Sequence, residues 1–156
     1  MKRFKPVGFL LLLIIMICTV SQDAGQVHAV SAGKSSGGFS ENEIQLLSQA
    51  VYGEARGEPY IGQVAVAAVI LNRLESESFP NTVSGIIFQP GAFTAVADGQ
   101  IWMKPDETSR KAVMDAINGW DPAEGAIYYF NPDTATSKWI WSRPQKKKIG
   151  KHIFCD

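Results

Sequence analysis

A glutamate that follows an apolar helical stripe is the residue in this sequence best placed for chemistry. Ile44, Leu47 and Val51 recur at helical spacing and predict one buried helix face. Glu54 comes three residues later on the same face. A carboxyl group at the margin of an apolar face loses hydration, which disfavours its charged form and raises its pKa. General acids near neutral pH need such a shift. Spacing alone leaves open that Glu54 is an ordinary residue of the last turn, paired with Arg56 or with solvent.

Glu58 is the second carboxylate candidate, because it lies four residues beyond Glu54. If the last helical turn continued that far, the two like charges would be neighbours, and one proton would be held more tightly. We therefore take Glu54 as the catalytic candidate and Glu58 as the fallback.

Aromatic residues are numerous in the second half of the chain. Flat rings can pack on the apolar C–H faces of sugars, and amide or hydroxyl side chains can bind sugar hydroxyl and acetamido groups. Burial in the core is the competing interpretation, above all for Tyr128 and Phe130. The candidate substrate-binding residues are Tyr52, Gln89, Phe93, Thr94, Gln100, Tyr129, Asn131 and Trp139.

Scarce residue types exclude several classes of enzyme. Beyond the first 29 residues the sequence holds one histidine, His152, and one cysteine, Cys155. A zinc peptidase or amidase needs about three protein ligands, and a Ser-His-Asp triad would depend on His152. His152 and Cys155 would point to opposite faces of a strand, so they form no catalytic pair. We expect no metal and no cofactor, which leaves the carboxylate chemistry typical of glycoside cleavage.

The N-terminal residues predict export. Basic residues precede the uncharged apolar run Val7–Val20, which is short for a membrane span and typical of a secretory signal. We place the signal at 1–29, with an uncleaved anchor as the alternative. Small polar residues at 30–38 predict a flexible linker, and 39–156 would be one domain. The chain has no net charge and no basic face, so we expect no nucleic acid partner.

Two long helices are predicted first. Ser40 and Glu43 form a capping box for a helix over Glu41–Arg56, which Gly57 could end in the left-handed conformation. The next helix, Tyr60–Leu74, has no polar face in its middle and should be the buried central helix.

Shorter elements follow. A short helix is predicted over Thr82–Ile87, and a longer one over Ser109–Asn118, capped by Thr108 and ended by Gly119. Ala126–Phe130 and Ile149–Cys155 are aromatic and β-branched enough for short strands. The predicted fold class is α+β, mainly α.

Four blocks of the sequence resemble a known family. They are Gln49–Arg73, Phe79–Ile101, Ala116–Pro122 and Tyr128–Cys155. Together they closely resemble the catalytic domain of the spore cortex-lytic enzymes, the SleB-type cell wall hydrolases. The resemblance covers nearly all of 39–156.

The resemblance implies a lysozyme-like domain related to lytic transglycosylases. It also implies cleavage of spore cortex peptidoglycan between N-acetylmuramic acid and N-acetylglucosamine during germination, leaving a 1,6-anhydromuramoyl end. The family's catalytic glutamate lies in the motif GEARGE, which stands here at Gly53–Glu58 and maps onto Glu54. Action on the cortex outside the inner spore membrane, a monomeric state and a companion germination protein are further expectations.

The sequence departs from the family in one respect. Full-length relatives carry a peptidoglycan-binding repeat before the catalytic domain, whereas only 30–38 separates signal and domain here, which puts cortex targeting by a separate module in doubt. Three alternatives remain: a muramidase or glucosaminidase that uses water, an N-acetylmuramoyl-L-alanine amidase, and a wall-binding module without catalysis.

Overall fold

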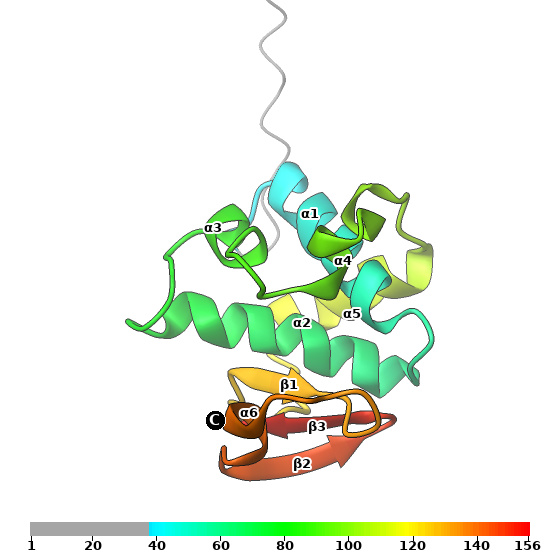
Figure 1. The fold of residues 1–156 in the computed structure, drawn as a ribbon. Coiled ribbons are helices and arrows are strands. Elements are labelled where there is room, and N and C mark those ends of the chain that lie inside the picture. Colours follow the sequence, from blue (N-terminus) through cyan, green and yellow to red (C-terminus); the bar gives the residue numbers. More distant parts are fainter. Residues whose placement is uncertain (1–37) are drawn as a thin grey trace, which may run out of the picture. The chain divides into compact units, whose positions relative to one another are not determined.

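The computed structural model describes residues 38–156 (Figure 1). The predicted signal at 1–29 and nearly all of the predicted linker at 30–38 lie outside the described residues. In the described part, no helix is long and apolar enough to cross a membrane.

Helix α1 (Glu41–Ala55) begins with the predicted capping box. The Ser40 hydroxyl accepts the Glu43 N–H at 3.3 Å, and the Glu43 carboxylate accepts the Ser40 N–H at 2.9 Å. The predicted role of Gly57 is wrong, because its φ is not positive. Instead, the Glu58 N–H bonds to the carbonyl of Ala55 at 2.9 Å. This turn ends α1 without a left-handed residue.

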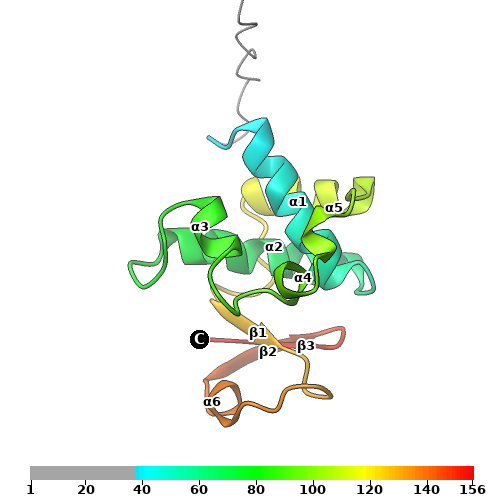
Figure 2. The same ribbon diagram turned by 45° about the horizontal axis from the view of Figure 1, so that its top comes forward.

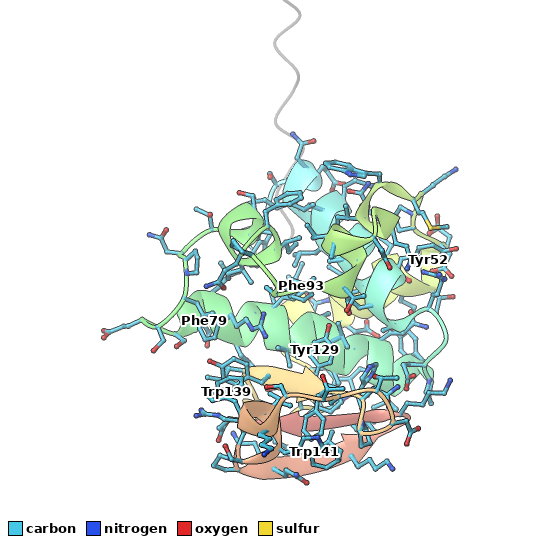
Figure 3. All side chains as sticks on the ribbon, viewed as in Figure 1. Tyr52, Phe79, Phe93, Tyr129, Trp139 and Trp141 are labelled. Atoms are coloured by element: carbon cyan, nitrogen blue, oxygen red, sulfur yellow. The ribbon has the colours of Figure 1, made fainter. Side chains whose placement is uncertain are left out.

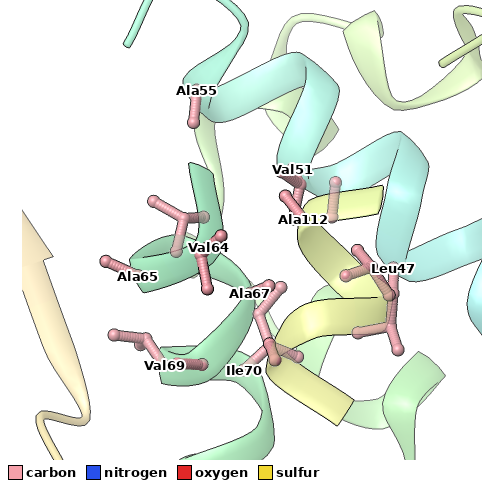
Figure 4. Packing of buried hydrophobic residues seen from close by; sticks show 14 of the residues in the cluster. Leu47, Val51, Ala55, Val64, Ala65, Ala67, Val69, Ile70 and Ala112 are labelled. Carbon is pink, nitrogen blue, oxygen red and sulfur yellow. The ribbon is translucent and has the colours of Figure 1, made fainter. Parts of the chain in front are cut away.

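Helix α2 (Tyr60–Glu75) is the central element, as predicted. Every residue from Gly62 to Ile70 is buried, so this stretch has no solvent face. In Figures 1 and 2, α1, α3 and α5 lie on one side of α2 and the sheet lies on the other. Figure 4 shows the core at the contact of three helices, where Val51 of α1, Ile70 of α2 and Ala112 of α5 come together.

The remaining helices are shorter. Helix α3 (Val83–Ile87) matches its prediction, and Thr82 caps it. Helix α5 (Glu107–Ile117) begins before its predicted start, because Asp106 rather than Thr108 is the cap and accepts the Ser109 N–H at 2.7 Å. Gly119 follows α5 with a φ of 98°, as expected of a residue that ends a helix. The sequence did not predict three short elements: α4 (Thr94–Ala97), the 3₁₀ helix η1 (Gln100–Trp102) and α6 (Lys138–Trp141).

Three antiparallel strands form the sheet: β1 (Tyr128–Phe130), β2 (Gln145–Ile149) and β3 (His152–Cys155). The spatial order is β1-β3-β2, so the last strand is central. The strand predicted over Ile149–Cys155 is confirmed for His152–Cys155, but Ile149 belongs to β2, because Gly150 (φ 57°) turns the chain between β2 and β3. The predicted mainly helical α+β class is confirmed.

Candidate active site

Glu54 lies in the last turn of α1, half-buried, with both carboxylate oxygens bonded. The backbone N–H of Ala95 donates to Oε1 at 2.6 Å, and the hydroxyl of Tyr129 donates to Oε2 at 3.1 Å. Burial raises the pKa of Glu54 above its usual value, and the negative charge of Asp98 adds to this effect. The two hydrogen bonds act in the opposite direction but do not cancel it. Glu54 can therefore keep a proton at higher pH than an exposed glutamate.

Close packing of α4 against α1 brings the Ala95 donor to Glu54. A Cβ on Gly53 would stand 2.5 Å from the Cβ of Ala95, so only glycine permits this approach. Tyr129 comes from the middle of β1, where its ring packs against His152 and Phe154 at centroid distances of 5.1 and 5.9 Å. The two donors thus come from opposite sides of α2, the helical layer and the sheet.

Glu54 opens into an extended depression between these two layers. A pocket of about 430 Å³ contains Glu54, and a second pocket of about 300 Å³ adjoins it. Both share Arg73, Gly91, Ala92 and Tyr129, so they form one continuous groove. The Glu54 end is also lined by Gly53, Thr94, Phe130, Asn131, Thr134, Ala135 and His152. The other end is also lined by Phe79, Gln89, Pro90, Tyr128, Trp139 and Ile140.

Five predicted substrate-binding residues line this groove: Gln89, Thr94, Tyr129, Asn131 and Trp139. Tyr129 and Trp139 are both labelled in Figure 3.

Three other predicted substrate-binding residues lie elsewhere. Phe93 is 3% exposed and belongs to the core, and the side-chain amide of Gln100 donates to Asp98. Tyr52 lies under the guanidinium of Arg56 and far from Trp139 in Figure 3. None of these three lines the groove, and sequence spacing could not show this because it does not show which way a side chain faces.

Glu58 lies beyond the end of α1 and does not line the groove. Its carboxylate accepts the backbone N–H of Lys151 at 2.8 Å and lies 3.9 Å from Nδ1 of His152. A Cβ on Gly150 would stand 2.0 Å from Glu58 Oε2, so the β2–β3 turn packs directly on this side chain. The like charge near Glu54 is that of Asp98, not that of Glu58 as the sequence suggested.

Sequence reasoning missed Arg73 as a groove residue and considered His152 only as a ligand or nucleophile partner. From the sequence, Arg73 is a basic residue in the last turn of a helix, a position where positive charge commonly interacts with the helix dipole. The signal available was its position two residues after Leu71, the end of the apolar stretch of α2.

A separate hollow of about 450 Å³ lies beside Tyr60, lined by Glu107, Thr108 and Lys111. The Lys111 ammonium already pairs with Asp115 at 2.7 Å. Within residues 38–156, no three histidine, cysteine or acidic side chains cluster as metal ligands would. Glu54 is therefore the stronger candidate for chemistry among the described residues.

Comparison with known proteins identifies the family of the chain. A family model described as Cell Wall Hydrolase matches residues 57–155, more than half of the chain. The chain belongs to the cell wall hydrolase family. The family match begins at Gly57, so Glu54 lies just outside it. A Bacillus cereus member named spore cortex-lytic enzyme is 77% identical over 118 residues, which cover 76% of this chain and 46% of that enzyme. The chain thus spans less than half the length of this relative.

Two solved structures of cell wall hydrolases share the fold. The catalytic domain of the Bacillus cereus SleB protein is 72% identical, with a TM-score of 0.73, and the match covers 80% of this chain and 99% of that one. The catalytic domain of SleB from Bacillus anthracis, described as a germination-specific lytic transglycosylase, is 76% identical with the same TM-score. This match covers 76% of this chain and 98% of that one. The predicted family resemblance is confirmed.

Proposed function

We propose that this chain is an exported enzyme that cleaves the glycan strands of spore cortex peptidoglycan, as a lytic transglycosylase with Glu54 as its acid and base. One observation carries the proposal: a half-buried carboxyl group of raised pKa, fixed by two donors, opens into an extended groove. The names of the Bacillus cereus and Bacillus anthracis relatives, a spore cortex-lytic enzyme and a germination-specific lytic transglycosylase, support the same reaction.

The reaction needs one residue to act twice. Protonated Glu54 donates to the glycosidic oxygen between N-acetylmuramic acid and N-acetylglucosamine, and the bond to the muramoyl C1 breaks. Positive charge develops at C1 and is eased by the substrate's own acetamido group. The Glu54 carboxylate then takes the proton of the muramoyl C6 hydroxyl, whose oxygen bonds to C1 and closes the anhydro ring. Proton transfer of this kind is worth about 10²–10⁴ in rate.

The composition of the groove favours this route over hydrolysis by two carboxylates. Among the described residues that line the groove, Glu54 is the only acidic one. Inverting hydrolases need a second carboxylate to activate water, and retaining ones usually use it as a nucleophile. A single carboxyl group suits an internal hydroxyl acceptor.

Paired substitutions test the assignment of Glu54. We expect Glu54→Gln to reduce lysis of permeabilised spores by at least about 10²-fold, because glutamine cannot donate the proton. Glu58→Gln should keep most of the activity, because Glu58 lies outside the groove. Lysis is followed as loss of turbidity, and circular dichroism checks that each variant folds. Loss of lysis by Glu58→Gln alone would transfer the role to Glu58.

Mass spectrometry of the released muropeptides tests the reaction. Anhydro ends are lighter by one water than the reducing ends that a muramidase or glucosaminidase leaves. An amidase would release stem peptides from intact glycan, and a binding module would bind the wall without producing fragments. Any of these three results would replace the transglycosylase proposal.

We further propose that residues 1–29 direct export and that the enzyme acts as a monomer on the cortex, outside the inner spore membrane. A companion germination protein is part of the same proposal. Fractionation of dormant spores and gel filtration of the purified protein test location and oligomeric state.

A further inference from the structure

Arg73 is a buried cation without a carboxylate partner. The residue is 5% exposed, and its Nε donates to the carbonyl oxygen of Ile127 at 2.7 Å. Among the described residues, that carbonyl is its only hydrogen-bond acceptor, and no acidic side chain forms an ion pair with it. A buried charge is costly unless it is paired. The terminal N–H groups of Arg73 have no acceptor among the described residues and are not sealed from the groove, so a bound ligand can accept hydrogen bonds from them.

Aromatic rings hold the guanidinium in place. Its carbon lies 5.2 Å from the ring centroids of Phe79 and Phe93, and 5.5 Å from that of Tyr128. Burial lowers the pKa of Arg73, but a guanidinium keeps its proton at every physiological pH. The side chain thus presents a fixed positive charge with few alternative positions.

The guanidinium lies at the junction of the two halves of the groove. Arg73 lines both the Glu54 pocket and the Trp139 pocket, together with Gly91 and Tyr129. Arg73 makes no ion pair with Glu54, so its guanidinium remains available to a ligand in the groove. A glycan lying along the groove from Trp139 to Glu54 would pass over the free N–H groups of Arg73.

We propose that Arg73 determines specificity by binding the carboxyl-derived oxygen of the lactyl substituent on a muramic residue. This inference rests on the proposed function. The lactyl group distinguishes muramic residues from the N-acetylglucosamine units of chitin, whereas acetamido groups occur in both polymers. Its oxygen is anionic in free muramic acid and a neutral carbonyl in muramic lactam. A guanidinium binds a carboxylate with two parallel hydrogen bonds and can also donate to a carbonyl.

Binding of three tetrasaccharides of equal length tests this proposal on the unaltered arginine. Titration calorimetry uses the full chain carrying Glu54→Gln, which blocks turnover. The ligands are a chitin tetramer, an N-acetylglucosamine–N-acetylmuramic acid tetramer with free carboxylates, and the same tetramer with lactam rings. We expect both muramic ligands to bind about 10- to 100-fold more tightly than the chitin tetramer.

The same measurement identifies which form Arg73 prefers. A carboxylate preference that weakens with salt indicates an ionic contact, and an equal or stronger lactam affinity indicates the neutral carbonyl. Equal affinity for all three ligands would overturn the role of Arg73 but leave a glycan-binding groove. Binding of none of them would contradict the proposed function itself.

Substitutions in the Glu54→Gln background add an independent readout. Adding Arg73→Gln should abolish the preference for muramic ligands while the affinity for the chitin tetramer changes little. Adding Arg73→Lys should keep part of the preference, because it retains the charge but loses the planar fork. Arg143→Gln is the matched control, because Arg143 also lies over Tyr128, at 5.3 Å, but lines neither pocket. A preference that survives Arg73→Gln would overturn the proposal.

Discussion

Glu54 is subject to two opposed influences, because burial disfavours its charge while two donors favour it. Sequence periodicity was enough to single out this carboxyl group. Sequence periodicity could not predict the two hydrogen-bond donors, because Ala95 and Tyr129 lie 41 and 75 residues from Glu54 along the chain. Arg73 was equally hidden, since its orientation depends on three rings from other elements. Residue types and local spacing thus indicated the chemistry, while the surroundings that tune it depend on tertiary contacts.

The hydrogen bond from Tyr129 predicts a shift in the pH profile. This bond lowers the pKa of Glu54, so Tyr129→Phe should raise that pKa further. Since the proposed mechanism needs Glu54 protonated in the free enzyme, activity should fall as pH rises through this pKa. The falling limb of kcat/KM against pH should therefore move to higher pH in Tyr129→Phe. Tyr128→Phe is the control, because Tyr128 is not bonded to Glu54, and an unmoved limb in Tyr129→Phe would contradict the prediction.

Glu54 also links stability to pH. Its folded pKa is raised, so the stability it contributes is full below the unfolded pKa and is lost as pH rises through the folded pKa. Glu54→Gln removes this dependence. We expect the variant to have the higher Tm at about pH 8, with the difference shrinking towards about pH 4. Thermal unfolding by circular dichroism at several pH values measures it, and a difference independent of pH would argue against a shifted Glu54.

At the level of elements, the contact between α1 and α4 depends on Gly53. Gly53→Ala gains helix propensity of about 1 kcal/mol, but its methyl group would displace Ala95 from Glu54. We expect lower activity and no net gain in stability. Gly57→Ala is the matched control, because nothing lies within 4 Å of its Cβ position, and it should be neutral or slightly stabilising. Activity assays and Tm of the two variants check this, and full activity in Gly53→Ala would refute it.

The N-cap of α5 can be tested by mutation, because the sequence predicted Thr108 and the structure has Asp106 at this position. Asp106→Ala removes the side chain that accepts the Ser109 N–H, which should destabilise the domain by about 1 kcal/mol. Thr108→Ala changes the cap that the sequence predicted, but Thr108 is exposed inside the helix, so the effect should be small. Urea unfolding measures both. The reverse ranking would restore the sequence prediction.

Elements with strong local signals were predictable, and those fixed by tertiary contacts were not. The capping box and the apolar run predicted where α1 and α2 begin and end to within one residue. Strand β2 was missed, because its exposed run Gln145–Lys148 is charged and shows no alternation of polar and apolar residues. Its pairing with β3 became visible only from the turn at Gly150.

In the described part as a whole, α2 joins the helical layer to the sheet and contributes more buried residues to the main core than any other element. Ile70 is fully buried among three helices, whereas Ile61 on the same helix is 39% exposed. Ile70→Ala should cost about 2–5 kcal/mol, and Ile61→Ala much less. The free energies of unfolding in urea test this, and equal losses would contradict α2 as the core element. The sequence predicted this central role, but not the groove, because the groove arises only where the two layers meet.

The central position of β3 has a consequence for biosynthesis. Strands β1 and β2 pair with β3 and not with each other, so neither has a partner before His152–Cys155 leaves the ribosome. Tyr129, which belongs to β1, cannot be fixed against Glu54 until then. A nascent chain therefore has no assembled candidate groove until the residues of β3 have been synthesised, so the sheet side and the helical side of the groove come together late.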